Sequence, residues 1–125
     1  MALTKVQSEM AGAGQVLQVV SATTATYVST NQSASWVDTG LTATITPKFA
    51  TSKILVLVTQ NGVSKTTGNT GVKMRLLGGG NSLAVIEDIA AFNGTSTDNR
   101  GQSKAFNYLD SPATTSAVIY KTQFV

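Results

Sequence analysis

Residues 33–60 read SASWVDTGLTATITPKFATSKILVLVTQ, and this stretch decides the fold class. Within residues 41–46 an apolar side chain alternates with threonine, which is the two-residue period of a strand with one solvent-exposed face. Residues 54–58 are apolar at every position, as is typical of a strand covered on both faces. A third short strand is predicted within residues 33–38, separated from the next one by Thr39 and Gly40. Consecutive strands of these kinds predict stacked β-sheets.

The remaining strands are predicted from runs of β-forming residues bounded by turn signals. Gly78 begins a Gly-Gly-Gly-Asn-Ser turn that predicts a hairpin, and Pro112 ends a strand because it cannot donate to a ladder. Residues 92–102 read as a polar loop. Eight or nine strands about ten residues apart predict an all-β, antiparallel β-sandwich with jelly-roll-like topology. The further predicted strands are residues 15–20, 24–29, 72–77, 83–89 (for which a short helix is the alternative), 103–110 and 117–125.

The length of 125 residues fits one domain with a core of its own. Residues 1–14 mix Met, Ala, Gly and polar residues without a period, which predicts an N-terminal anchoring arm ahead of a β-sandwich domain over residues 15–125. The N-terminus has no apolar run of the length a signal peptide needs, and residues 54–58 are too few to cross a bilayer. We therefore expect no membrane insertion.

The composition excludes several kinds of chemistry. The chain has no Cys and no His, so disulfides, thiolate metal sites and the commonest general base are absent. Nine basic and six acidic residues give a net charge of +3, and the basic residues are dispersed along the chain. Without a basic stripe we expect no nucleic-acid partner.

Three motifs resemble sites for chemistry but have simpler explanations. Residues 78–80 lack the Lys-Ser/Thr and the helix of a phosphate-binding loop, so a hairpin turn is favoured. Glu87 and Asp88 could bind a cation with Asp98 or Asp110, but neighbouring strand residues point to opposite faces, which favours solvated charges. Asp38 or Asp110 beside a serine lacks the histidine of a hydrolytic triad. We expect a non-enzymatic protein with no catalytic, cofactor-binding or metal-binding residues.

The aromatic residues allow two interpretations. They could form a stacking platform for sugars, but their spread over separate strands at alternating positions favours the core. Trp36 is expected to cover one end of that core. Phe92 is the exception, because it is placed in a loop and is therefore the candidate receptor contact. The set comprises Tyr27, Trp36, Phe49, Phe92, Phe106, Tyr108, Tyr120 and Phe124.

Several stretches, taken in their order along the chain, carry a resemblance to a known family: residues 15–20, 35–41, 43–47, 52–58, and 109–116 with 120–121. They resemble phage virion proteins, chiefly tail-fibre and other appendage β-sandwich proteins of marine and cyanobacterial phages. The opening MALTKV is also similar to the start of phage fibre and adaptor proteins, where such an arm joins the particle. This second resemblance implies that Leu3, Thr4, Lys5 and Val6 anchor the chain to the virion.

The resemblance implies a β-sandwich displayed on the virion, commonly as a homotrimer, after assembly in the host cytoplasm. It implies partners among the other virion proteins, and a host-surface glycan or protein if the chain acts in attachment. The relatives continue beyond the position of Val125 with a further pair of strands, so either a neighbouring subunit pairs the open edge or the edge stays exposed. A capsid decoration (cement) protein and a carbohydrate-binding module remain as alternatives.

Overall fold

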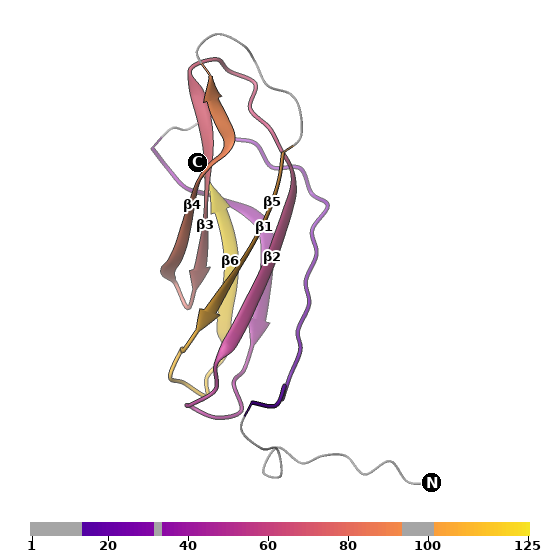
Figure 1. Ribbon diagram of the computed structural model, residues 1–125, viewed down its shortest axis with the longest axis vertical. Helices are drawn as coiled ribbons and strands as arrows, with labels where there is room; N and C mark the ends of the chain where they lie inside the picture. Colours follow the sequence, from indigo (N-terminus) through magenta and orange to yellow (C-terminus); the bar gives the residue numbers. More distant parts are fainter. Residues whose placement is uncertain (1–13, 32–33, 94–101) are drawn as a thin grey trace, which may run out of the picture.

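The computed structural model describes residues 14–31, 34–93 and 102–125, with only the backbone described for residues 87–93. Six strands make up its regular structure (Figure 1). No described residue belongs to a helix that could cross a membrane. The strands are β1 (Val37–Ile45), β2 (Ile54–Val63), β3 (Thr70–Gly78), β4 (Asn81–Asn93), β5 (Gln102–Asp110) and β6 (Val118–Phe124).

These strands form two antiparallel sheets. One has four strands in the order β1-β6-β3-β4, and the other consists of β2 and β5. The all-β prediction is confirmed, and the strands expected at residues 72–77, 103–110 and 117–125 appear as β3, β5 and β6. Residues 83–89 lie within β4, so the helical alternative for them is wrong. Because β4 extends through Asn93, the expectation that a loop begins at Phe92 is also wrong.

The β3–β4 hairpin turns at two glycines. Gly78 pairs with Asn81, and Gly79 and Gly80 between them have φ angles of 58° and 87°. Two successive positive φ values are what a type I′ turn requires, and glycine adopts them without steric cost. The predicted hairpin turn is confirmed.

Strand β1 joins two segments that were expected to be separate strands. The ladder between β1 and β6 shifts register between Asp38 and Thr42, and Gly40 within this interval has a φ of 85°. The glycine accommodates an irregular backbone inside the strand, as in a β-bulge. The Thr-Gly pair therefore bends one strand and does not end it.

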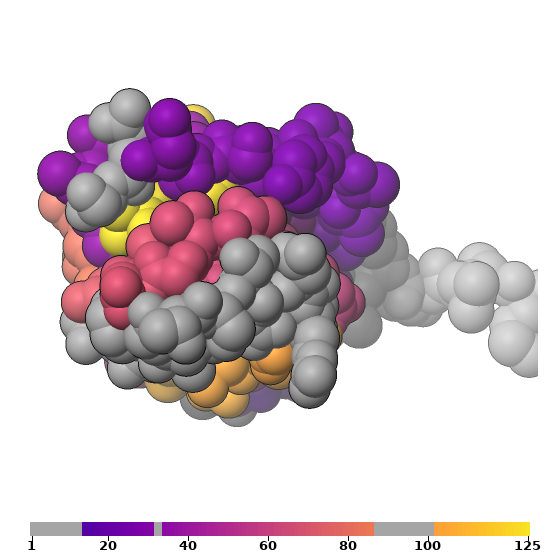
Figure 2. Space-filling view, turned by 90° about the horizontal axis from the view of Figure 1, so that it is seen from above, coloured from indigo at the N-terminus to yellow at the C-terminus, as the bar shows by residue number. Residues whose placement is uncertain are grey.

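The prediction of strands at residues 15–20 and 24–29 is wrong for the single chain. Residues 14–31 run in extended form beside β1 and β2, with no strand ladder (Figure 1). Figure 2 shows this segment as a ridge along one side of the molecule. Residues 15–20 and 24–29 are rich in β-forming residues, but a strand also needs a partner edge at hydrogen-bonding distance. We call residues 15–29 the extended segment.

The two sheets face each other across a small core. Ile54 of β2 packs with Val118 and Tyr120 of β6, and all three are buried. Met74 and Leu76 of β3 are also almost completely inaccessible. The alternation of β2 places Ile54 and Val58 inside, because successive strand residues point to opposite faces.

The other side of β2 is open to solvent. Leu55 is 58% exposed and Leu57 is 73% exposed. The expectation that residues 54–58 are covered on both faces is therefore wrong for the single chain. Both faces of an apolar strand are buried only when something lies against each of them, and the described part of this chain covers one face.

Candidate functional site

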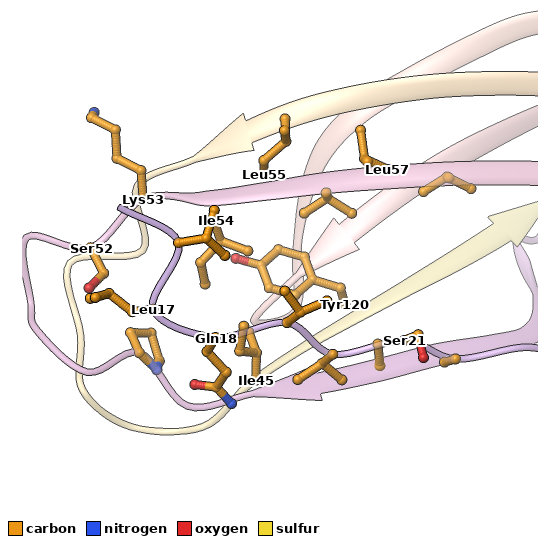
Figure 3. Close-up of a pocket in the computed structure, with 18 of the residues that line it drawn as sticks. Leu17, Gln18, Ser21, Ile45, Ser52, Lys53, Ile54, Leu55, Leu57 and Tyr120 are labelled. Atoms are coloured by element: carbon orange, nitrogen blue, oxygen red, sulfur yellow. The ribbon is translucent and has the colours of Figure 1, made fainter. Parts of the chain in front are cut away.

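A groove opens on the side of the molecule where neither sheet has a further strand among the described residues. β1 is an edge of the four-stranded sheet and β2 is an edge of the other, and the extended segment lies over the gap between them. The groove has a volume of about 1040 Å³. Its lining is largely apolar, with Leu17 from the extended segment, Ile45 from β1 and Ile54 from β2 (Figure 3).

The extended segment is only loosely attached to the rest of the chain. Within the described part of the chain, the one hydrogen bond made by residues 15–29 joins Thr26 N to Thr24 Oγ1 at 3.4 Å. Val16 and Val19 are each 81% exposed. Leu17 and Val20 line the groove but are not buried. A β-forming segment with a solvated backbone can pair with a strand edge or rest on another surface.

Tyr120 crosses the interior next to this groove. Its hydroxyl donates a hydrogen bond of 2.6 Å to Asp110 Oδ2, which links β6 of one sheet to β5 of the other. Asp110 Oδ1 accepts a second bond, from Ser111 N. Burial, followed by the hydrogen bond to Asp110, raises the pKa of Tyr120 well above its usual value. The Asp110 carboxylate thus has a structural partner in each of its two oxygen contacts.

The outer face of the four-stranded sheet carries a chain of polar contacts. Lys121 Nζ lies 2.9 Å from Asp38 Oδ2, and Gln123 Nε2 donates to Asp38 Oδ1 at 2.5 Å. Arg75 Nε donates to Gln123 Oε1, and its guanidinium lies 4.5 Å from the centroid of the Trp36 ring. The hydrogen bonds from Lys121 and Gln123 lower the pKa of Asp38. We call these five residues the polar network.

The position of Trp36 differs from the expectation that it covers one end of the core. Trp36 is only partly buried, and its ring packs against Arg75. Among the other aromatic residues with described side chains, Tyr120 is in the core, whereas Tyr27 is 81% exposed and Phe49 is 41% exposed. The core interpretation therefore fails for the last two.

A second groove, of about 930 Å³, includes both Tyr27 and Trp36 in its lining. Gln60 also lines it, and the side-chain oxygen of this residue is buried without a hydrogen-bond partner in the described structure. Two aromatic rings and an unsatisfied amide acceptor are the kinds of groups that contact a polar, ring-shaped ligand.

The described structure does not cover the side chains of the sequence-predicted site residues. Leu3, Thr4, Lys5 and Val6 lie outside the described residues. The backbone of Phe92 belongs to β4, but its side chain is likewise outside the description. In the described ranges no three acidic side chains are grouped so that they could hold a metal ion.

Sequence reasoning missed three exposed leucines, Leu55, Leu57 and Leu109. Leu55 pairs with Leu109 across β2 and β5, and both point away from the interior. The signal was present, since residues 54–58 have no polar position on either face. That pattern predicts cover on both faces, and a surface buried between chains produces it as well as one buried within a single chain.

The comparisons with known proteins do not extend this description. Neither the protein-family models nor the curated proteins nor the solved structures contain a match to this chain.

Proposed function

We propose that this chain is a structural component of a phage virion, a tail fibre or tail appendage protein that acts in assembly or host attachment. It works by contact with other macromolecules and not by catalysis. The observation that carries the proposal is the extended segment, whose described backbone belongs to no strand ladder and whose Val16 and Val19 are each 81% exposed. Surfaces of this kind suit a protein that completes itself in an assembly.

The proposal includes a finer fold for the assembled state. There the extended segment forms two more strands, at residues 15–20 and 24–29, and completes a jelly-roll-like β-sandwich. Its extended course beside two free strand edges supports this. Hydrogen exchange of residues 15–29 should slow strongly on assembly. Equally fast exchange in assembled and isolated protein would contradict the extra strands.

The location in the particle is tested by labelling. Antibody against this chain, bound to purified particles of the phage that encodes it, should mark the tail. Label over the shell would instead support the runner-up, a capsid decoration protein. Particles without label, while the same antibody detects the chain in infected-cell lysate, would refute a virion role.

The proposed anchor is residues 1–14, with Leu3, Thr4, Lys5 and Val6 making the contact. Deletion of residues 1–14 should lower the number of copies of this chain per particle at least tenfold, as measured by quantitative mass spectrometry. Lys48→Ala, an exposed change outside the arm, is the control. Normal occupancy without the arm would show that anchoring lies elsewhere.

A homotrimer is the proposed oligomeric state, because association gives partners to a side of the molecule that one chain leaves open. Sedimentation velocity at micromolar concentration should show a species of three times the 13.0 kDa chain mass. A stable monomer would contradict this part of the proposal.

Glycan binding is a second candidate function, favoured by the groove that holds Tyr27, Trp36 and the unpartnered Gln60 oxygen. On a glycan array, Tyr27→Ala should abolish a signal that depends on this groove. Phe92→Ala tests the sequence-predicted contact, and Phe49→Ala, outside the second groove, is the control. An unchanged glycan signal in both Tyr27→Ala and Phe92→Ala would remove this candidate.

A further inference from the structure

Asn61 and Gly62 lie at an interruption of the ladder between β2 and β5. The regular pairing of β2 stops after Gln60 and resumes at Val63, and across this interval two residues of β2 face one residue of β5. This is the arrangement of a β-bulge, in which the extra residue stays outside the pairing and the ladder is locally disrupted. The backbone at Asn61 and Gly62 is therefore held less firmly by the neighbouring strand than the rest of β2.

The peptide unit between Asn61 and Gly62 is also open sterically. Gly62 has a φ of 73°, in the left-handed region that glycine adopts readily. A Cβ added to Gly62 would meet no other part of the described structure within 4 Å. Both residues are exposed to solvent. No side chain shields the Gly62 backbone nitrogen, and the exposed Asn61 side chain can rotate toward it.

We propose that Asn61 is a site of spontaneous deamidation. The Gly62 nitrogen loses its proton and attacks Cγ of Asn61, so that a new C–N bond forms and the bond from Cγ to Nδ2 breaks. The proton lost from Gly62 is returned, in the net reaction, to the departing amide, which leaves as ammonia. Water then opens the five-membered succinimide at either carbonyl and gives aspartate or isoaspartate at position 61. No oxidant or catalyst is needed, because the two reacting groups are adjacent in the chain.

The other asparagines with described side chains lack this combination of features. Asn107 is paired in the regular part of the β2–β5 ladder, and the bulky side chain of Tyr108 follows it. Asn31, Asn69 and Asn81 also precede residues that carry a side chain, which hinders attack by the next backbone nitrogen. Within the part of the chain whose side chains are described, Asn61 alone is followed by glycine.

The reaction would add a carboxylate to the second groove. Asn61 and Gly62 line this groove together with Gln60, whose side-chain oxygen is buried without a hydrogen-bond partner in the described structure. The neutral amide becomes an acid that is ionised at neutral pH, so the net charge of +3 falls by one unit. The charge of the groove thus changes in one direction as the protein ages. This inference goes beyond the proposed virion role and does not depend on it.

The fold should survive the modification. Isoaspartate lengthens the main chain by one methylene group, and the bulge already accommodates a residue that the ladder does not pair. The regular pairs from Ile54 to Gln60 and the core contact of Ile54 lie in the other part of β2. We therefore expect the deamidated chain to accumulate as a folded protein.

The test follows the purified full chain at mildly alkaline pH and physiological temperature by peptide mapping. Trypsin cleavage after Lys53 and Lys65 releases residues 54–65, a peptide in which Asn61 is the one asparagine. This peptide should gain one mass unit, and electron-transfer fragmentation should locate both aspartate and isoaspartate at position 61. The reaction should accelerate as the pH rises, because the deprotonated Gly62 nitrogen is the nucleophile. The circular-dichroism spectrum should stay unchanged.

Two comparisons separate the contribution of the structure from that of the sequence. The chain unfolded in guanidinium gives the intrinsic rate at Asn61, and the folded chain should react within about tenfold of it, because the bulge leaves the site unprotected. Asn107 is the control within the same ladder, and its tryptic peptide, residues 105–121, should stay unmodified in the folded chain. The second Asn-Gly pair, at Asn93, falls in a different peptide, residues 76–100, and does not disturb the measurement.

A variant tests the role of the glycine. Gly62→Asn introduces a side chain at a residue type that tolerates a positive φ, and it should slow the reaction at Asn61 at least tenfold. An unchanged rate in a folded Gly62→Asn protein would overturn the inference. If this variant does not fold, the wild-type comparison decides the matter, since a folded chain that reacts more than tenfold slower than the unfolded chain would also overturn it. A mass gain without isoaspartate would do the same. The particle-labelling experiment on the virion role is unaffected by any of these results.

Discussion

Tyr120 and Asp110 form the hydrogen bond that ties the two sheets together. The phenol oxygen lies 2.6 Å from Asp110 Oδ2, and Asp110 itself pairs with Ile54 at the end of the β2–β5 ladder. One side chain therefore joins β6 of the four-stranded sheet to the two-stranded sheet, next to the core formed by Ile54, Val118 and Tyr120. Among the described residues few side chains are buried, and this contact is one that links the two layers.

Tyr120→Phe should lower the free energy of unfolding by about 1–3 kcal/mol, because it removes a hydrogen bond to a carboxylate and keeps the ring. Urea unfolding followed by circular dichroism measures the change. Tyr27→Phe, at a position that is 81% exposed, should be nearly neutral. Equal stability of the Tyr120→Phe protein and the wild type would contradict the structural role.

The same variant has a pH signature. Burial and the bond to Asp110 raise the pKa of Tyr120, so the folded protein keeps the phenol protonated when an unfolded chain begins to ionise, at about pH 10. The contribution is complete below that pH and declines as the pH rises further. The stability gap between wild type and Tyr120→Phe should therefore narrow above about pH 10. A constant gap would mean that the residue titrates alike in both states.

Thr39 and Thr122 form a buried hydroxyl pair between β1 and β6. Their Oγ1 atoms lie 2.5 Å apart, and Leu41 N donates to Thr39 Oγ1 at 3.1 Å, within the irregular part of β1. Thr39→Val should cost about 1–3 kcal/mol, since it leaves buried polar groups without partners. A double-mutant cycle with Thr122→Val should give a combined loss smaller than the sum of the single losses. Strict additivity would show that the hydroxyls do not interact.

Gly78 is required by close packing. An added Cβ at this position would lie 2.5 Å from Leu83 Cδ1 and 2.7 Å from Tyr120 Cε1. Gly78→Ala should therefore destabilise the protein by about 1–3 kcal/mol through overpacking. Ser82→Ala, an exposed change in the same hairpin, is the control for thermal unfolding. A wild-type melting temperature in Gly78→Ala would show that the hairpin moves aside freely.

Asp38 should make a small, acid-sensitive contribution. Hydrogen bonds from Lys121 and Gln123 lower its pKa, so its stabilisation is present above the unfolded value of about 3.9 and is lost as the pH falls through the lower folded value. Its side chain is 53% exposed, so Asp38→Asn should cost less than about 1 kcal/mol at neutral pH. The difference from wild type should vanish at about pH 2. A difference that persists there would indicate a packing effect.

Local patterns were sufficient wherever a residue's neighbours in sequence decide its structure. The three glycines before Asn81 predicted the β3–β4 turn, and Pro112 correctly marked the end of β5. The alternation in residues 41–46 predicted the main part of β1. The candidate site was predicted less well, because its residues come from distant parts of the chain and none of them has a chemical signature by itself.

The amino-acid sequence alone determined that this is an all-β chain and where β3, β5 and β6 lie, because strand period, turn glycines and proline act over a few residues. Only the tertiary structure decided that residues 15–29 stay outside the ladders and that Leu55, Leu57 and Leu109 share an open face. Pairing and burial depend on which surfaces meet in space. An apolar run records that cover is needed, and the fold determines whether the same chain can supply it.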